Sequence, residues 1–161
     1  MSNDTACLPD GIRTASLEPT RANLNYSFGL PGGPYCLGMA RTVVRRLLSE
    51  HGLADMAELG VLAASELLGN ACLFTPGRDV SLSVRWQYGV LRLTVFDEHP
   101  AHAADVGDAC RARRRRALST LDALVGACGG ICGLAPAEGP LAGSRMWVVV
   151  PREAAALYAR I

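Results

Sequence analysis

Residues 55–74 read Asp-Met-Ala-Glu-Leu-Gly-Val-Leu-Ala-Ala-Ser-Glu-Leu-Leu-Gly-Asn-Ala-Cys-Leu-Phe, and the spacing of the apolar residues predicts one amphipathic helix. We expect Asp55 to cap its N-terminus and Thr75-Pro-Gly77 to end it. At about 100° per residue, Glu66 and Asn70 fall on the apolar stripe, one turn apart. Burying a carboxylate and an amide costs free energy unless they are paired or bind something. The stretch therefore predicts a ligand site or a metal-bridged site on this helix.

A third polar side chain, that of Asp97, is expected to face the same core. Residues 80–87 and 91–97 alternate between apolar and polar, and the turn Tyr88-Gly89 between them indicates a β-hairpin. Continuing the period of two places Asp97 on the face of Leu91, at the end of its strand. An inward carboxylate at a strand end is a candidate ligand-binding group.

The other predicted elements give the fold class. Residues 1–22 lack periodicity and are expected to be a mobile tail, so residues 23–161 form a single domain. The remaining expectations, in chain order, are an edge strand at 23–30, a helix at 35–51, an irregular loop at 98–110, a helix at 110–128, and strands at 131–134 and 145–150. This order predicts an α/β (α+β) protein, a two-layer sandwich with a mixed, mostly antiparallel sheet and about three helices on one face.

Composition excludes several classes of protein. The chain has 161 residues and a formal net charge of +1, so we expect no direct nucleic-acid binding. No apolar run, including residues 146–150, is long enough for a membrane span, and the N-terminus carries no secretory pattern. We therefore expect a cytoplasmic protein without a membrane partner. The six cysteines then lie in a reducing compartment, where structural disulfides are rare.

Four sequence motifs point to a known superfamily. Ala64-Ser-Glu-Leu-Leu-Gly-Asn-Ala71 is similar to a SELVTNA box, and Leu91-Arg-Leu-Thr-Val-Phe-Asp97 looks like a strand that precedes an adenine-binding loop. Leu121-Asp-Ala-Leu124 and Gly143-Ser-Arg-Met-Trp-Val148 resemble VDAL and GGKTVW stretches. Together, these residues resemble the GHKL (Bergerat-fold) ATPase superfamily, and more closely the small histidine-kinase-like ATP-binding regulators that include the anti-sigma-factor serine kinases.

The resemblance implies a role for each inward polar group. Asn70 would give an amide oxygen to Mg²⁺, which bridges the triphosphate of ATP. Glu66 would act as the catalytic base on a water or a protein hydroxyl beside the γ-phosphate. Asp97 would accept a hydrogen bond from the adenine amino group. Arg145, within the last motif, is also expected at the nucleotide.

The segment before the third helix departs from the superfamily pattern. Aligning residues 121–124 with VDAL places Arg115 and Ala117 where a Gly-Arg-Gly-Leu pattern has its glycines, which let backbone N–H groups approach phosphate. The run of residues 111–116 leaves four interpretations open: a phosphate clamp that uses Arg115 and Arg116, a DNA-binding patch, a solvated helix end, or a docking patch for an acidic protein surface.

His99 and His102, with Asp97 and Asp105 nearby, have the outline of a metal site, although a loop containing Pro100 predicts no fixed geometry for it. Cys128 and Cys132 lack a second ligand pair, so we expect no zinc site there.

Two functions follow from the sequence. The first is a bacterial regulator of the anti-sigma-factor type that binds ATP and Mg²⁺, with possible serine/threonine-protein kinase activity, and acts on a sigma factor, an anti-anti-sigma-type antagonist or another transcription regulator. The second is a pseudo-ATPase that no longer binds nucleotide and serves only in protein interaction. Both imply a homodimer or a heterocomplex.

Overall fold

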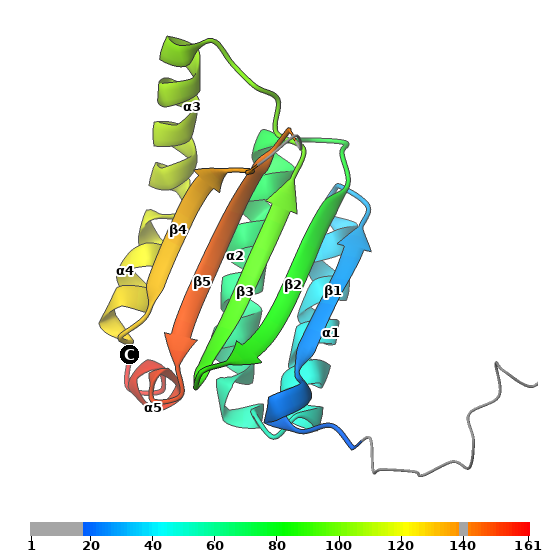
Figure 1. Cartoon of the computed structure of the whole chain (residues 1–161). Helices are drawn as coiled ribbons and strands as arrows, with labels where there is room; N and C mark the ends of the chain where they lie inside the picture. The colour runs from blue at the N-terminus through cyan, green and yellow to red at the C-terminus, as the bar shows by residue number, and fades with distance from the viewer. Residues whose placement is uncertain (1–17, 139–141) are drawn as a thin grey trace, which may run out of the picture.

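Five strands form one sheet in the order β1-β2-β3-β5-β4, and each neighbouring pair is antiparallel (Figure 1). The computed structural model describes residues 18–138 and 142–161. The strands are β1 (Asn25–Leu30), β2 (Val80–Gln87), β3 (Val90–Asp97), β4 (Ile131–Pro136) and β5 (Ser144–Pro151). The expected hairpin and edge strand are confirmed, whereas the expected mixed sheet is fully antiparallel.

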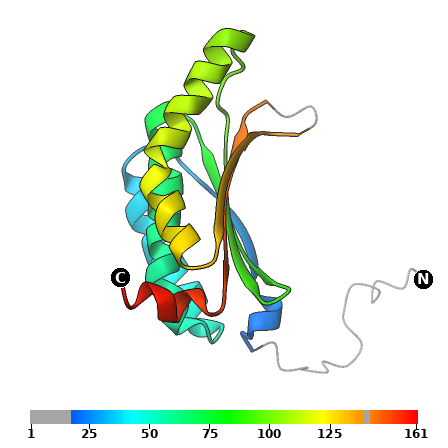
Figure 2. The same ribbon diagram turned by 90° about the vertical axis from the view of Figure 1, so that its left-hand side faces the viewer.

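The α-helices lie on one face of this sheet, and the other face carries no α-helix of the described chain (Figure 2). They are α1 (Tyr35–Glu50), α2 (Ala57–Phe74), α3 (Ala104–Ala117), α4 (Ser119–Ala127) and the short α5 (Ala154–Tyr158). Figure 1 shows that the first part of α3 extends beyond the sheet, at the end where β3 stops. The predicted two-layer α+β sandwich is therefore confirmed.

The core lies between the two layers. Alternate residues of the central strands point toward the helices and are almost fully buried, among them Leu82, Leu91, Leu93, Met146 and Val148. Each such side chain contributes about 1.5–3 kcal/mol through burial. α2 crosses behind this part of the sheet and buries ten of its residues. The stretch Ala54–Phe74 is the one part of the described chain that has the length and composition of a membrane span, and 56% of its most apolar window is buried inside this fold.

Two expectations about α2 are wrong. The helix begins at Ala57 after a 3₁₀ turn, and Asp55 does not cap it but accepts a hydrogen bond from Arg152 at 2.6 Å. Glu66 is exposed. The buried face of α2 centres on the line from Gly60 to Leu67, and Glu66 lies about 100° around the helix from Leu67. The apolar stripe inferred from the sequence was therefore the edge of the buried face.

The expected helix at 110–128 is two helices, α3 and α4, separated by Leu118. The expected loop at 98–110 ends early because α3 already begins at Ala104, and α5 was not predicted. Residues 1–17 of the expected tail lie outside the described residues. The described chain is tied to the fold from Thr20, whose carbonyl oxygen lies 2.6 Å from Nδ1 of His51.

Two glycines of α2 provide a test of this packing. A Cβ atom on Gly60 would lie 2.6 Å from Cδ1 of the buried Leu48, whereas one on Gly69 meets nothing within 4 Å. Gly69→Ala should stabilise the protein by about 0.5–1 kcal/mol because alanine favours helix. Gly60→Ala should lose that gain through the contact with Leu48. Urea unfolding measures both, and equal stabilisation by the two substitutions would show that α2 packs differently.

Candidate functional site

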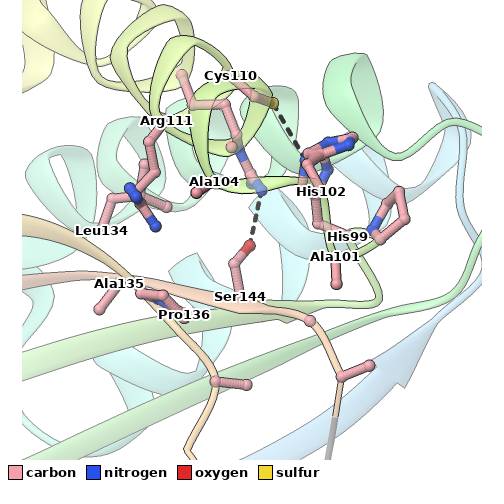
Figure 3. A pocket seen from close by; sticks show the side chains of 16 residues that line it. His99, Ala101, His102, Ala104, Cys110, Arg111, Leu134, Ala135, Pro136 and Ser144 are labelled. Carbon is pink, nitrogen blue, oxygen red and sulfur yellow. Dashed lines mark hydrogen bonds between the residues drawn. The ribbon is translucent and has the colours of Figure 1, made fainter.

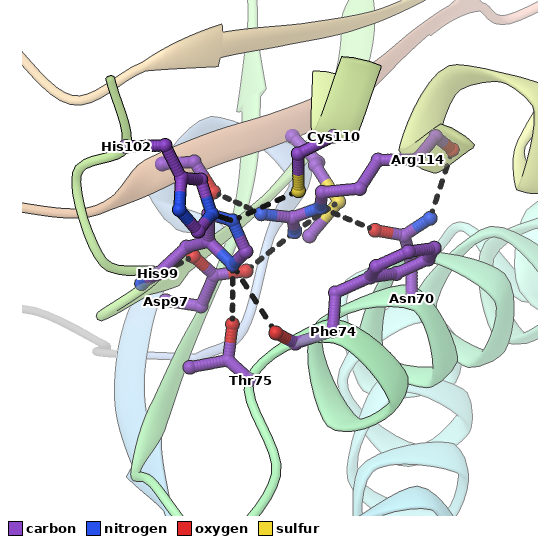
Figure 4. A network of polar contacts seen from close by, with 10 residues as sticks. Asn70, Phe74, Thr75, Asp97, His99, His102, Cys110 and Arg114 are labelled. Carbon is purple, nitrogen blue, oxygen red and sulfur yellow. Dashed lines mark hydrogen bonds and ion pairs between the residues drawn. The ribbon is translucent and has the colours of Figure 1, made fainter. Parts of the chain in front are cut away.

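A buried polar cluster joins α2, β3, α3 and β5 at the end of the sheet (Figure 4). Its centre is the guanidinium of Arg114, which is 1% exposed. The Nη2 atom of Arg114 lies 2.5 Å from Oδ2 of Asp97, and Nη1 donates to Oγ of Ser144 at 2.7 Å. The Nε atom donates to Oδ1 of Asn70 at 2.9 Å. One cation therefore binds side chains from three other elements.

Every side-chain polar atom of Asp97 and Asn70 has a hydrogen-bond partner in this cluster. The other carboxylate oxygen of Asp97, Oδ1, accepts from the Ser144 hydroxyl at 2.6 Å and from the backbone N–H of His99 at 3.1 Å. The Nδ2 atom of Asn70 donates to the carbonyl oxygen of Arg114 at 3.0 Å. Among the buried side-chain polar atoms of the described residues, only Nε of Arg145 lacks a partner. The cost of burying these charges is thus met within the protein.

The local sequence explains how each group reaches the cluster. Asp97 and Ser144 are directly opposite in the β3–β5 register, so their side chains point to the same side of the sheet. Asn70 lies on the buried face of α2. Arg114 precedes Leu118 by one helical turn, and Leu118 continues the buried face of α4. The guanidinium also lies 5.7 Å from the centre of the Phe74 ring, within the range of a cation–π contact.

Sequence reasoning missed Arg114, although a signal was present. Leu121 and Val125 are buried, as is Leu118. Stepping back four residues from Leu118 along the same helical face gives Arg114, which singles it out from the other arginines of the run.

The central cluster contains two of the predicted site residues, Asn70 and Asp97, and Arg114 links them. Arg115 donates to the carbonyl oxygen of Leu134 at 3.2 Å, and Arg116 is exposed. Arg145 lies on the helix-free face of the sheet, because it is opposite Phe96 rather than Asp97 in the β3–β5 register.

Glu66 lies on the solvent side of this cluster. It lines a depression of about 370 Å³ bordered by α1, α2 and the last residue of α3, together with Asn70, Arg41 and Ala117. Glu66 is exposed, so its expected inward position is wrong, whereas Asn70 is buried as expected.

The predicted phosphate-binding segment is helical. Arg115 and Ala117, which stand at the expected glycine positions, belong to the last turn of α3. The backbone N–H groups inside an α-helix donate to carbonyls four residues back, and the N–H of Leu118 donates to Arg114 and Arg115. The amides that would otherwise approach a phosphate are therefore already bonded.

A second group of side chains lies beside Arg114. His99, His102 and Cys110 place one ligand atom each within 4.8 Å of one another, and they border a cavity of about 330 Å³ (Figure 3). Burial, and after it the Arg114 guanidinium, lower the pKa of His99 below its usual value. The neutral ring of His99 is therefore favoured.

Compared with models of protein families and with curated protein sequences, the chain matches none.

Removing the central cation should destabilise the fold. Arg114→Met leaves the Asp97 carboxylate buried without a countercharge, which costs about 3–5 kcal/mol. Arg116→Met, two residues away and exposed, should change the free energy of unfolding by less than about 0.5 kcal/mol. Urea denaturation checks both.

A double variant separates the ion pair from general packing. Arg114→Met combined with Asp97→Asn should lose less stability than the sum of the two single changes, because neither charge is then left unpaired. Additive losses would mean that the two side chains are not coupled.

Proposed function

We propose that this chain is a regulatory pseudo-ATPase of the histidine-kinase-like (GHKL) class, which acts in transcriptional control by binding a protein partner rather than ATP. The observation that carries the proposal is the position of Arg114. Its guanidinium bonds both to Asp97, the group expected to receive adenine, and to Asn70, the group expected to hold Mg²⁺. The resemblance in sequence supports the class, and the contacts of Arg114 support the loss of the nucleotide.

Adenine recognition requires a free carboxylate oxygen on Asp97. Both oxygens already accept hydrogen bonds from Arg114, Ser144 and the backbone of His99. A nucleotide would have to displace the guanidinium from a charge that is 5% exposed. Separating a buried ion pair costs about 3–5 kcal/mol, which corresponds to a loss of about 10²–10⁴ in affinity.

Phosphate binding meets a second obstacle. The Asn70 oxygen that was expected to bind Mg²⁺ accepts from Nε of Arg114, and the amide nitrogen donates to the Arg114 carbonyl oxygen. The last turn of α3 runs through Arg115 and Ala117, so this segment offers no helix N-terminus to a phosphate. The two groups expected to bind the ends of ATP, Asp97 and Asn70, are therefore both bonded to Arg114.

The second candidate function is an ATP- and Mg²⁺-dependent serine/threonine kinase of the anti-sigma type. Asn70 and Asp97 favour it, because they lie close enough to share one guanidinium, as two groups binding a single nucleotide would. In that function Glu66, which faces solvent one turn before Asn70, would serve as the base for a hydroxyl of an antagonist protein.

A protein partner is part of both functions, and we propose a sigma factor, an anti-anti-sigma-type antagonist or another transcription regulator. One end of the helical layer offers apolar contact surface. Tyr35 and Met39 on α1 are 87% and 63% exposed, and Leu73 on α2 is 69% exposed. These helix ends adjoin, because Sγ of Cys36 lies 3.4 Å from Sγ of Cys72.

Calorimetric titration of the full chain with ATP, with and without Mg²⁺, tests the choice between the two functions. We expect no saturable heat at millimolar ATP, for the wild-type protein and for Asn70→Ala alike. Arg114 is already bonded to Asp97 and Asn70, the groups that a nucleotide would need. Micromolar, Mg²⁺-dependent binding that is lost in Asn70→Ala would contradict the pseudo-ATPase and establish the kinase-type site.

A further inference from the structure

Three side chains capable of binding a metal converge beside the Arg114 cluster. His99 and His102 come from the segment after β3, and Cys110 comes from the second turn of α3. The Nε2 atom of His99 lies 3.1 Å from Nε2 of His102 and 3.2 Å from Sγ of Cys110. All three potential ligand atoms lie within 4.8 Å of one another. Figure 4 shows the two rings and the thiol directed toward one another.

These separations are close to those of a tetrahedral zinc site. With Zn–N and Zn–S bonds of about 2.0–2.3 Å, neighbouring ligand atoms in a tetrahedron lie about 3.3–3.6 Å apart. The distances of 3.1 and 3.2 Å at Nε2 of His99 are shorter than these by only a few tenths of an ångström. His102 is exposed, so its ring can rotate to widen these separations when an ion enters.

The first ligand, His99, is already oriented for metal binding. Its Nδ1 atom lies 3.2 Å from the carbonyl oxygen of Phe74, at the C-terminal end of α2, and 3.3 Å from Oγ1 of Thr75. A carbonyl oxygen only accepts hydrogen bonds, so Nδ1 carries the proton and Nε2 presents its lone pair. Histidine ligands in metalloproteins are typically held by such a second hydrogen bond from the other ring nitrogen.

The charge and chemistry of the group select the ion. Two imidazoles and one thiolate suit a borderline-soft divalent ion, of which Zn²⁺ is the common biological example. The two arginines that border the cavity are each paired with a carboxylate, Arg114 with Asp97 and Arg111 with Asp108. A three-residue ligand set leaves a fourth position, which faces the cavity bordered by Arg111 and Ser144 (Figure 3).

We propose that His99, His102 and Cys110 bind a single Zn²⁺ ion with one coordination position open to this cavity. The ion would join the segment after β3 to α3, and through the Phe74 carbonyl to the end of α2. It would thereby fix the part of α3 that extends beyond the sheet, one turn away from Arg114 (Figure 1). The site does not depend on whether the protein binds ATP.

Cobalt titration of the full-length, metal-free, reduced protein tests the proposal. Co²⁺ replaces zinc in such sites and reports a bound thiolate by charge-transfer absorption and a tetrahedral geometry by strong visible bands. We expect one Co²⁺ per chain with both signatures, and bleaching on addition of Zn²⁺. Cys110→Ser should abolish the charge-transfer band. His102→Ala should weaken binding by at least about tenfold, the loss that follows even when only an outer partner of a ligand is removed.

The control variants are Cys132→Ser, which removes another partly buried thiol, and Cys72→Ser, which breaks the thiol pair with Cys36. Both should keep the full cobalt spectrum. Zn²⁺ should raise the melting temperature of the wild type and of both controls, but not of Cys110→Ser. Circular dichroism establishes that each variant is folded. Absence of saturable cobalt binding, or a thiolate band that persists in Cys110→Ser and disappears in Cys72→Ser, would overturn the proposal.

Discussion

The buried ion pair between Asp97 and Arg114 determines how this end of the molecule is built. An arginine taken out of water is tolerated only where its donors find acceptors, and Arg114 finds them on β3, β5 and α2. The pair therefore fixes α3 to the end of the sheet by one residue, while the remaining arginines of the run stay at or near the surface. Arg114 is the one buried residue of α3, so no other fully buried side chain of this helix holds it in place.

The Asp97–Arg114 ion pair also connects the buried cluster to the neighbouring group of His99, His102 and Cys110. The Asp97 carboxylate that holds Arg114 also accepts the backbone N–H of His99, and the Nδ1 of His99 is held by the end of α2. The group that we expected to recognise a nucleotide is thus paired with a side chain of the protein, and the adjoining segment carries the three residues of our proposed metal site. Under our proposals, the protein has exchanged a diffusible ligand for an internal cation and has kept the surrounding framework for contacts with a partner.

Much of the fold follows from the sequence because local patterns specify it. The period of two in residues 80–97 fixed the hairpin and the inward direction of Asp97, and the apolar run before Pro151 fixed the last strand. Glu66 was misplaced because α2 is apolar over more than half its circumference, so its sequence does not define where the buried face ends. Arg114 was missed because a run of arginines suggests solvent, and because its partner Asp97 comes from a different element of the fold.

Hydrogen exchange at the side-chain Nε–H of Arg114, followed by NMR in the full protein, tests most directly whether the guanidinium stays bonded to Asp97 and Asn70. The signal is assigned by its loss in Arg114→Lys. A buried Nε–H that donates to Asn70 at 2.9 Å should exchange slowly with water and keep its chemical shift when millimolar Mg²⁺-ATP is added. Rapid exchange would show that the Arg114 guanidinium is not held between Asp97 and Asn70. A chemical shift that follows the ATP concentration would show that the nucleotide binds beside it.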